Sequence, residues 1–144
     1  MKRSGRLSYH LCRILLGLFF VYAGALKISD AQAFAGQVAA YQILPYQWNY
    51  VAAATLPWIE ILCGFLLIVN QKVRPASLVI GVLTIVFIVA LVSVMLRGLD
   101  IDCGCFGPKI QSTPQQALLR NVFILALTHF VFHLRNKYAR KEEG

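Results

Sequence analysis

The sequence predicts an all-α integral membrane protein, a four-helix bundle with its N-terminus and C-terminus in the cytoplasm. Of its 144 residues 58% are hydrophobic, which is more than a soluble domain of this size usually contains. Four successive segments of about 20 apolar residues are each long enough to cross a bilayer. Basic residues gather beyond alternate ends of these segments, as the positive-inside rule requires.

The predicted membrane-spanning helices form a single domain over residues 1–144 and cover about residues 8–28, 49–69, 75–96 and 114–134. The third helix contains no charged residue. The fourth has its own start signal, with Thr113 as the N-cap, Pro114 at the first helical position and Gln116 completing a capping box. The first apolar run also resembles a signal peptide, but Arg13 interrupts it, so we expect a retained helix.

A net charge of +8 would suit a nucleic-acid-binding protein, but the distribution of the charge indicates a membrane protein instead. The cationic residues that lie before the first helix, after the second and after the fourth are Lys2, Arg3, Arg6, Lys72, Arg74, Arg135, Lys137, Arg140 and Lys141. The other two connections balance basic against acidic residues. We therefore expect an inner-membrane protein in contact with lipid, without a nucleic-acid partner, whose last connection faces the periplasm.

The first two predicted helices carry matching stripes of small and charged residues. The stripes consist of Arg13, Gly17, Phe20, Gly24 and Lys27 on the first helix, and of Ala53, Pro57, Glu60 and Gly64 on the second. Glycines on such a stripe favour close packing of the two helices. Pro57 lacks a backbone donor, which predicts a bend in its helix.

Glu60 is predicted to lie near the middle of the bilayer, where an ionised carboxylate needs a partner. Arg13, from the inner side, and Arg120, from the outer side, are the expected partners. Two interpretations remain open: a buried structural ion pair, and a functional group that carries a proton or holds a polar head group such as a quinone. Arg13, Glu60 and Arg120 are therefore candidate cofactor-binding residues, with quinone as the candidate cofactor.

Four further residues could carry chemistry but favour structural interpretations. Cys12 and Cys63 lie in the cytoplasmic halves of their helices and are expected to pack as small hydrophobic residues. His129 and His133 are four residues apart and share a helix face. Two histidines make an incomplete metal site, so we expect inward-facing polar residues and no metal.

The stretch "DIDCGCFG" from Asp100 to Gly107 is the strongest chemical signal in the chain. Cys103 and Cys105 can close only a small, strained disulfide ring, and strained, exposed disulfides exchange readily. Asp100 and Asp102 disfavour the thiolate forms and so favour the oxidised pair. A copper or zinc clip is the competing interpretation, but two sulfurs are too few for a closed zinc site. Cys103 and Cys105 are the predicted catalytic residues.

The strings "RILLGLFFVYAGALKISD", "YQILP", "LPWIEILCG", "DCGCFG" and "LLRN" resemble the MauE-like branch of the DoxX-like membrane proteins. The resemblance runs from about Arg13 to Asn121, and "CGCFG" is its most specific part. It implies a redox-associated membrane partner of thioredoxin-fold proteins, linked to maturation of disulfide-rich methylamine dehydrogenase. The residues that the resemblance singles out are Arg13, Lys27, Asp30, Pro57, Glu60, Cys103, Cys105 and Arg120. Cys12 and Cys63 are not part of that pattern.

The leading hypothesis is therefore a thiol:disulfide oxidoreductase, linked to quinone, that exchanges disulfides with a periplasmic thioredoxin-like protein. Because Asp102 adjoins Cys103, Cys105 is the better leaving group, so Cys103 is expected to form the bond to the partner. Two other hypotheses stay open: a non-catalytic assembly factor that anchors a maturation enzyme, and a small solute or metal transporter that uses Glu60.

Overall fold

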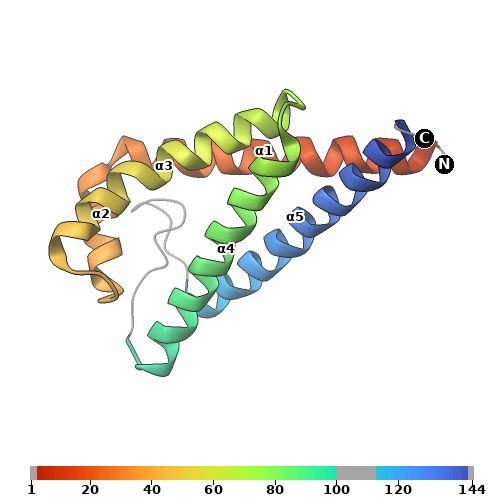
Figure 1. Ribbon diagram of the computed structural model, residues 1–144. Coiled ribbons are helices and arrows are strands. Elements are labelled where there is room, and N and C mark those ends of the chain that lie inside the picture. Colours follow the sequence, from red (N-terminus) through yellow and green to blue (C-terminus); the bar gives the residue numbers. More distant parts are fainter. Residues whose placement is uncertain (1–2, 100–112, 143–144) are drawn as a thin grey trace.

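The computed structural model describes residues 3–99 and 113–142, with side chains described as far as Lys137. The helices in these ranges are α1 (Arg3–Ser29), α2 (Ala31–Ala40), α3 (Tyr46–Ile68), α4 (Val73–Leu96) and α5 (Pro114–Glu142), and the described residues contain no strand (Figure 1). Helices α1, α3, α4 and α5 are each long and apolar enough to cross a membrane. The predicted all-α membrane bundle is therefore confirmed.

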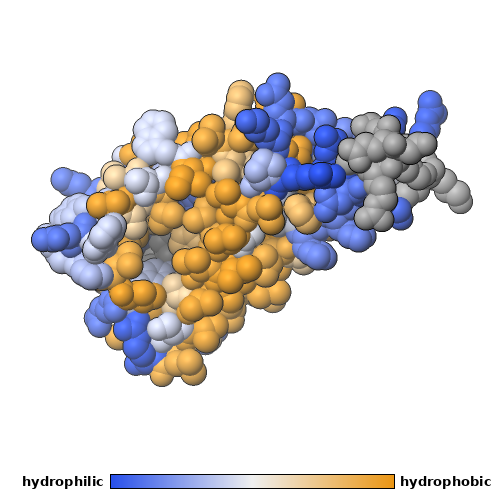
Figure 2. All heavy atoms as spheres, viewed as in Figure 1, coloured by the Kyte–Doolittle hydropathy of each residue, from blue (hydrophilic) through white to orange (hydrophobic). Residues whose placement is uncertain are grey.

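The outer surface of the bundle is apolar. Large hydrophobic side chains are exposed on every long helix, among them Leu18 on α1, Trp58 on α3, Val89 on α4 and Phe123 on α5. Figure 2 shows such side chains covering the middle of the visible face, while hydrophilic residues gather towards its ends. A soluble monomer rarely exposes so large an apolar area, so lipid is the natural covering of this surface.

The long helices begin or end a few residues away from the predicted limits. Helix α1 starts at Arg3 and α5 continues to Glu142, because the polar residues flanking these two spans extend the same helices. Helix α3 starts at Tyr46, after Pro45 in an extended conformation. Helix α5 begins as predicted: the Thr113 hydroxyl accepts a hydrogen bond from the backbone N–H of Gln116 at 3.4 Å.

Helix α2 was not predicted, because its ten residues are too few to cross a bilayer and belong to a connection between spans. The Asp30 carboxylate caps it by accepting a hydrogen bond from the N–H of Ala33 at 3.1 Å. Phe34 and Val38, one turn apart, pack in a cluster with Ala53 of α3. The short helix thus lies against the N-terminal half of α3.

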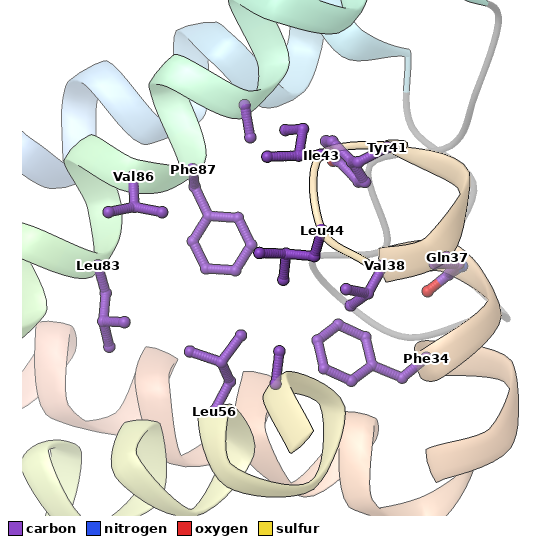
Figure 3. Close-up of a pocket in the computed structure, with 12 residues that line it drawn as sticks. Phe34, Gln37, Val38, Tyr41, Ile43, Leu44, Leu56, Leu83, Val86 and Phe87 are labelled. Carbon is purple, nitrogen blue, oxygen red and sulfur yellow. The ribbon is translucent and has the colours of Figure 1, made fainter. Parts of the chain in front are cut away.

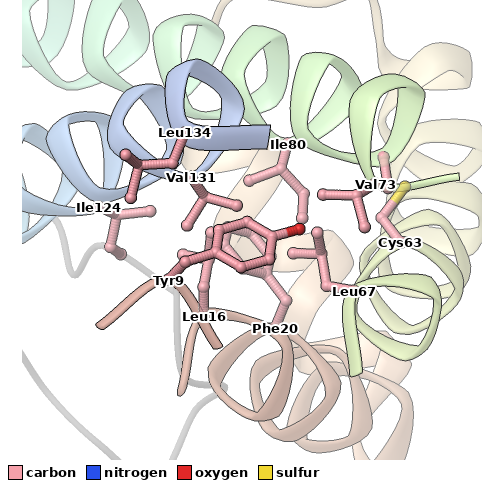
Figure 4. Close-up of a cluster of buried hydrophobic side chains, with 11 residues drawn as sticks. Tyr9, Leu16, Phe20, Cys63, Leu67, Val73, Ile80, Ile124, Val131 and Leu134 are labelled. Carbon is pink, nitrogen blue, oxygen red and sulfur yellow. The ribbon is translucent and has the colours of Figure 1, made fainter. Parts of the chain in front are cut away.

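The long helices associate as two antiparallel pairs, α1 with α3 and α4 with α5. The pairs join around a core to which all four long helices contribute, with Tyr9, Leu67, Ile80 and Val131 among its members (Figure 4). The two pairs lie close together where α1 begins and α5 ends, and they diverge towards the opposite end of the bundle (Figure 1). Helix α2 lies at this wider end. This divergence decides where cavities form in the bundle.

Candidate functional site

A buried ion pair joins α1 to α3. The Lys27 ammonium lies 2.7 Å from Glu60 Oε1 and 2.8 Å from Oε2, and both side chains are only 2% exposed. The rings of Phe34 and Phe87 lie 5.3 and 5.2 Å from Lys27 Nζ and flank it. At these distances the aromatic faces add cation–π attraction to the ion pair. Both charges are thus removed from lipid and compensated.

Close approach of the α1 and α3 backbones positions this pair. A Cβ atom added to Gly24 would lie 2.7 Å from the carbonyl oxygen of Pro57, and one added to Gly17 would lie 2.7 Å from that of Gly64. Only glycine fits such contacts, and the predicted packing role of the stripes is confirmed. Lys27 and Glu60 each lie three residues beyond a contact point, so the same approach brings them within reach of each other.

The partner predicted for Glu60 was wrong. Within residues 3–99 and 113–137, Glu60 forms its ion pair with Lys27, not with Arg13 or Arg120. Lys27 was placed on the stripe of the first helix but was not considered as the partner of Glu60, and it is a buried member of α1. The signal was in the sequence, because Lys27 completes the stripe. A Lys side chain on α1 and a Glu side chain on the antiparallel α3 also both lean towards the start of their own helix, and so towards each other.

Arg13 lies at the other end of the α1–α3 pair, beside the C-terminal end of α3. It is 4% exposed and donates hydrogen bonds to the carbonyl oxygens of Leu67 and Ile68, the latter at 3.2 Å. These are the last carbonyls of α3, which have no partner within the helix, and a cation there also opposes the helix dipole. Fourteen residues separate Arg13 from Lys27, about 21 Å along a helix. Arg13 is therefore a cap of α3, remote from the ion pair.

Arg120 and Asn121 of α5 meet the ion pair at a small internal cavity. The cavity has a volume of about 20 Å³ and is also lined by Thr84 of α4. That volume is enough for one water molecule. Asn121 is buried, and its Nδ2 atom has no hydrogen-bond partner among the described residues. Glu60 and Arg120 thus line the same small cavity, but the cation paired with Glu60 is Lys27, not Arg13 or Arg120.

Tyr41, the C-cap residue of α2, packs against the C-terminal part of α4. Its ring packs in a cluster with Leu91, Val94 and Ala117. Arg97 donates hydrogen bonds to the carbonyl oxygens of Tyr41 and Gln42, the latter at 3.4 Å. Burial raises the pKa of Tyr41 to about 12, although the nearby charge of Arg120 acts in the opposite direction. Its hydroxyl therefore keeps its proton at any physiological pH.

The described residues include both stems of the cysteine-containing connection. On one side, α4 ends at Leu96, Gly98 follows in a left-handed conformation with φ of 67°, and Leu99 N–H donates to the Val94 carbonyl at 3.1 Å. Leu99 then packs against the Tyr41 cluster. On the other side, Thr113 caps α5. The predicted catalytic residues Cys103 and Cys105, with Asp100 and Asp102, lie outside the described residues.

The remaining candidates take structural positions. Cys63 is buried in the central core, Cys12 packs against that core, and both are free thiols, as expected (Figure 4). His129 and His133 share a helix face, with ring centroids 6.3 Å apart. That face is exposed, so the prediction that they point inward was wrong. The described residues contain no group of three or more metal-ligating side chains.

Comparison with known proteins gives one family. The family model described as methylamine utilisation protein MauE matches residues 6–134. Methylamine utilization protein MauE of Paracoccus denitrificans is 36% identical over 117 residues, or 80% of this chain and 63% of that protein. Protein TlpB of Flavobacterium psychrophilum is 28% identical over 146 residues, or 94% of this chain and 39% of that protein. The chain thus spans less than two thirds of either relative. No solved structure matches the chain.

Proposed function

Since this chain is a multi-pass membrane protein that belongs to the MauE family of methylamine utilisation proteins, we propose that it is a thiol–disulfide redox protein of the inner membrane. Cys103 and Cys105 exchange disulfides with a periplasmic thioredoxin-like protein and so support the maturation of periplasmic redox proteins. The observation that carries the proposal is the anchoring of both stems of the cysteine connection: Leu99 packs against the Tyr41 cluster, and Thr113 caps α5.

The orientation in the membrane follows from the distribution of charge. Tyr9 near the start of α1 donates to Asn70 in the α3–α4 turn at 3.4 Å, so the basic residues around both lie on one side of the bundle. The chain leaves α5 on that side as well (Figure 1). The positive-inside rule makes this side cytoplasmic, which puts α2 and the stems of the cysteine connection on the periplasmic side.

The proposed reaction is a two-step exchange. A thiolate of the partner attacks Cys103, a mixed disulfide forms, and the Cys105 sulfur leaves. The partner's second thiol then displaces Cys103, so the partner gains a disulfide and the Cys103–Cys105 pair becomes a dithiol. A membrane quinone would supply the oxidation that restores the disulfide, since the two electrons and two protons of this dithiol convert a quinone to a quinol.

Trapping the mixed disulfide tests the proposal. A Cys105→Ser variant cannot close its own disulfide, so the adduct forms by the reverse exchange: the Cys103 thiolate attacks the disulfide of the oxidised partner, and one partner sulfur leaves as a thiolate. Without Cys105 this chain cannot release the partner from Cys103, so the adduct should accumulate on non-reducing gels. The Cys103→Ser variant is the matched control and should trap much less. Mass spectrometry of the adduct should identify a protein with a thioredoxin fold.

The opposite outcome favours a different kind of function. If neither single variant traps a partner and the double serine variant keeps full function in vivo, the cysteine pair is not the redox centre. The chain would then act as an assembly factor that anchors a maturation enzyme.

A further inference from the structure

A second, larger cavity lies between α2, α3 and α4, at the wider end of the bundle (Figure 3). Its volume is about 170 Å³. Phe34 and Gln37 of α2, Leu56 of α3 and Phe87 of α4 are among the side chains that line it. The cavity forms because the two helix pairs diverge here, and α2 is too short to fill the space between them.

The lining is almost entirely apolar, with a single buried hydrogen-bonding atom that lacks a partner. Gln37 Oε1 has no partner in the part of the chain that the structure describes. An orphaned amide oxygen in an apolar environment costs free energy, because its hydrogen bonds to water are lost without replacement. Figure 3 shows Gln37 beside Phe34 and Val38 at the rim of the cavity. A ligand that fills this cavity and donates a hydrogen bond to Gln37 Oε1 would remove that cost.

The cavity adjoins the buried ion pair. Phe34 and Phe87, which form two of its walls, are the same rings that flank Lys27 Nζ at 5.3 and 5.2 Å. Tyr41 also lines the cavity. Its carbonyl accepts a hydrogen bond from Arg97, which lies just before the cysteine connection. A molecule in the cavity would therefore lie between the ion pair and the stem that leads to Cys103.

Size and polarity select the class of ligand. An apolar cavity of about 150 Å³ accommodates a single six-membered aromatic ring, so 170 Å³ suits a ring with small substituents. Ile43, Leu44 and Val86 line the cavity and are 44–59% exposed, which gives an apolar tail a path to the lipid. An acyl chain alone would leave Gln37 unbonded, whereas an amide can donate to a quinone carbonyl and accept from a quinol hydroxyl.

We propose that this cavity binds the ring of a lipid-soluble quinone, with the Gln37 amide as its hydrogen-bonding residue. The inference rests on the proposed function for the choice of a redox-active ring. It moves the quinone site away from Arg13, Glu60 and Arg120, to which the sequence assigned it, and onto the α2 side of the Lys27–Glu60 pair.

Equilibrium binding of decylubiquinone, kept reduced as the quinol under anaerobic conditions, to the protein in phosphatidylcholine nanodiscs tests the proposal. We expect saturable binding with one site per chain. Gln37→Leu should weaken it about tenfold, the usual effect of losing one hydrogen bond of about 1.4 kcal/mol. Ala52→Phe, which fills the cavity from α3, should abolish binding. Gln32→Leu is the matched control, because Gln32 is an exposed amide on the same helix, and it should bind like the unmodified chain.

Two results would overturn the proposal: the absence of saturable binding, or unchanged affinity in Gln37→Leu while Ala52→Phe blocks binding, which would indicate an acyl-chain site. Circular dichroism of each variant shows whether the bundle has folded. The Cys103→Ser/Cys105→Ser variant separates this inference from the proposed function. Quinone binding in that variant, together with failure of the Cys105→Ser variant to trap a mixed disulfide, would leave the cavity assignment standing and remove the thiol exchange. Trapped partner without quinone binding would do the reverse.

Discussion

Removing one member of the Lys27–Glu60 pair should damage the protein far more than removing both. Lys27→Met leaves the Glu60 carboxylate without its cation, and Glu60→Leu leaves the ammonium without its anion. Both side chains are 2% exposed, so water cannot compensate for the missing partner. The double variant Lys27→Met/Glu60→Leu contains no buried charge at this position and keeps side chains of similar volume.

The expected magnitudes follow from this burial. Breaking a buried ion pair by removing one partner costs about 3–5 kcal/mol, and solvent screening does not reduce the figure for groups this deeply buried. Each single variant should therefore shift the unfolding equilibrium by roughly two to four orders of magnitude. Replacing both members by apolar residues is often neutral or stabilising, so the double variant should lie within about 1 kcal/mol of the unmodified chain or above it.

Equilibrium unfolding in mixed micelles, followed by circular dichroism, measures the three free energies of unfolding and hence the coupling between the two sites. A double variant that loses the sum of the two single losses would refute the reasoning, because the two residues would then act independently. Single losses below about 1 kcal/mol would refute it as well, because the charges would then be hydrated.

Three further outcomes are expected. Gly24→Ala should lower the free energy of unfolding, because the added Cβ would lie 2.7 Å from the Pro57 carbonyl oxygen. The control Gly36→Ala has open space around the added Cβ, so thermal unfolding should show it to be neutral or stabilising by up to about 1 kcal/mol. Arg13→Met should cost about 1–3 kcal/mol, because the Ile68 carbonyl loses the Arg13 hydrogen bond and the Leu67 carbonyl keeps only the N–H of Asn70. Partner trapping should stay unchanged, and normal stability with lost trapping would contradict the capping role. The pKa of Tyr41 is raised from 10.0 to about 12, so its contribution to the free energy of unfolding is complete below pH 10 and falls as the pH rises towards 12. Tyr41→Phe should therefore remove this alkaline loss of stability when unfolding is measured as a function of pH. An unchanged pH profile in Tyr41→Phe would contradict the assignment of the loss to Tyr41.

The membrane-spanning helices were predictable because length and apolar composition decide them almost alone. Local chemistry also fixed the start of α5, where Thr113 and Pro114 act as expected. The glycine stripes on α1 and α3 indicated their packing, since small residues at helical spacing mark close contacts between membrane helices. These features depend on neighbouring residues in the chain or on a single repeating face.

The remaining features depend on how the helices are placed in three dimensions. Glu60 clearly needed a partner, but choosing Lys27 over Arg13 requires the antiparallel register of α1 and α3 and the lean of both side chains. The exposed face of His129 depends on which side of α5 meets α4. The large cavity depends on the divergence of the helix pairs, which no local pattern of residues reveals.

The side of the membrane on which the cysteine pair reacts tests the central claim most directly. A membrane-impermeant thiol reagent is applied to intact cells before and after mild reduction, and labelled peptides are identified. The account predicts that Cys103 and Cys105 are labelled only after reduction, while Cys12 and Cys63, packed in or against the core, are labelled only after denaturation. Labelling of Cys103 or Cys105 only after the cytoplasm has been opened would contradict the account, because no periplasmic partner could then reach the pair.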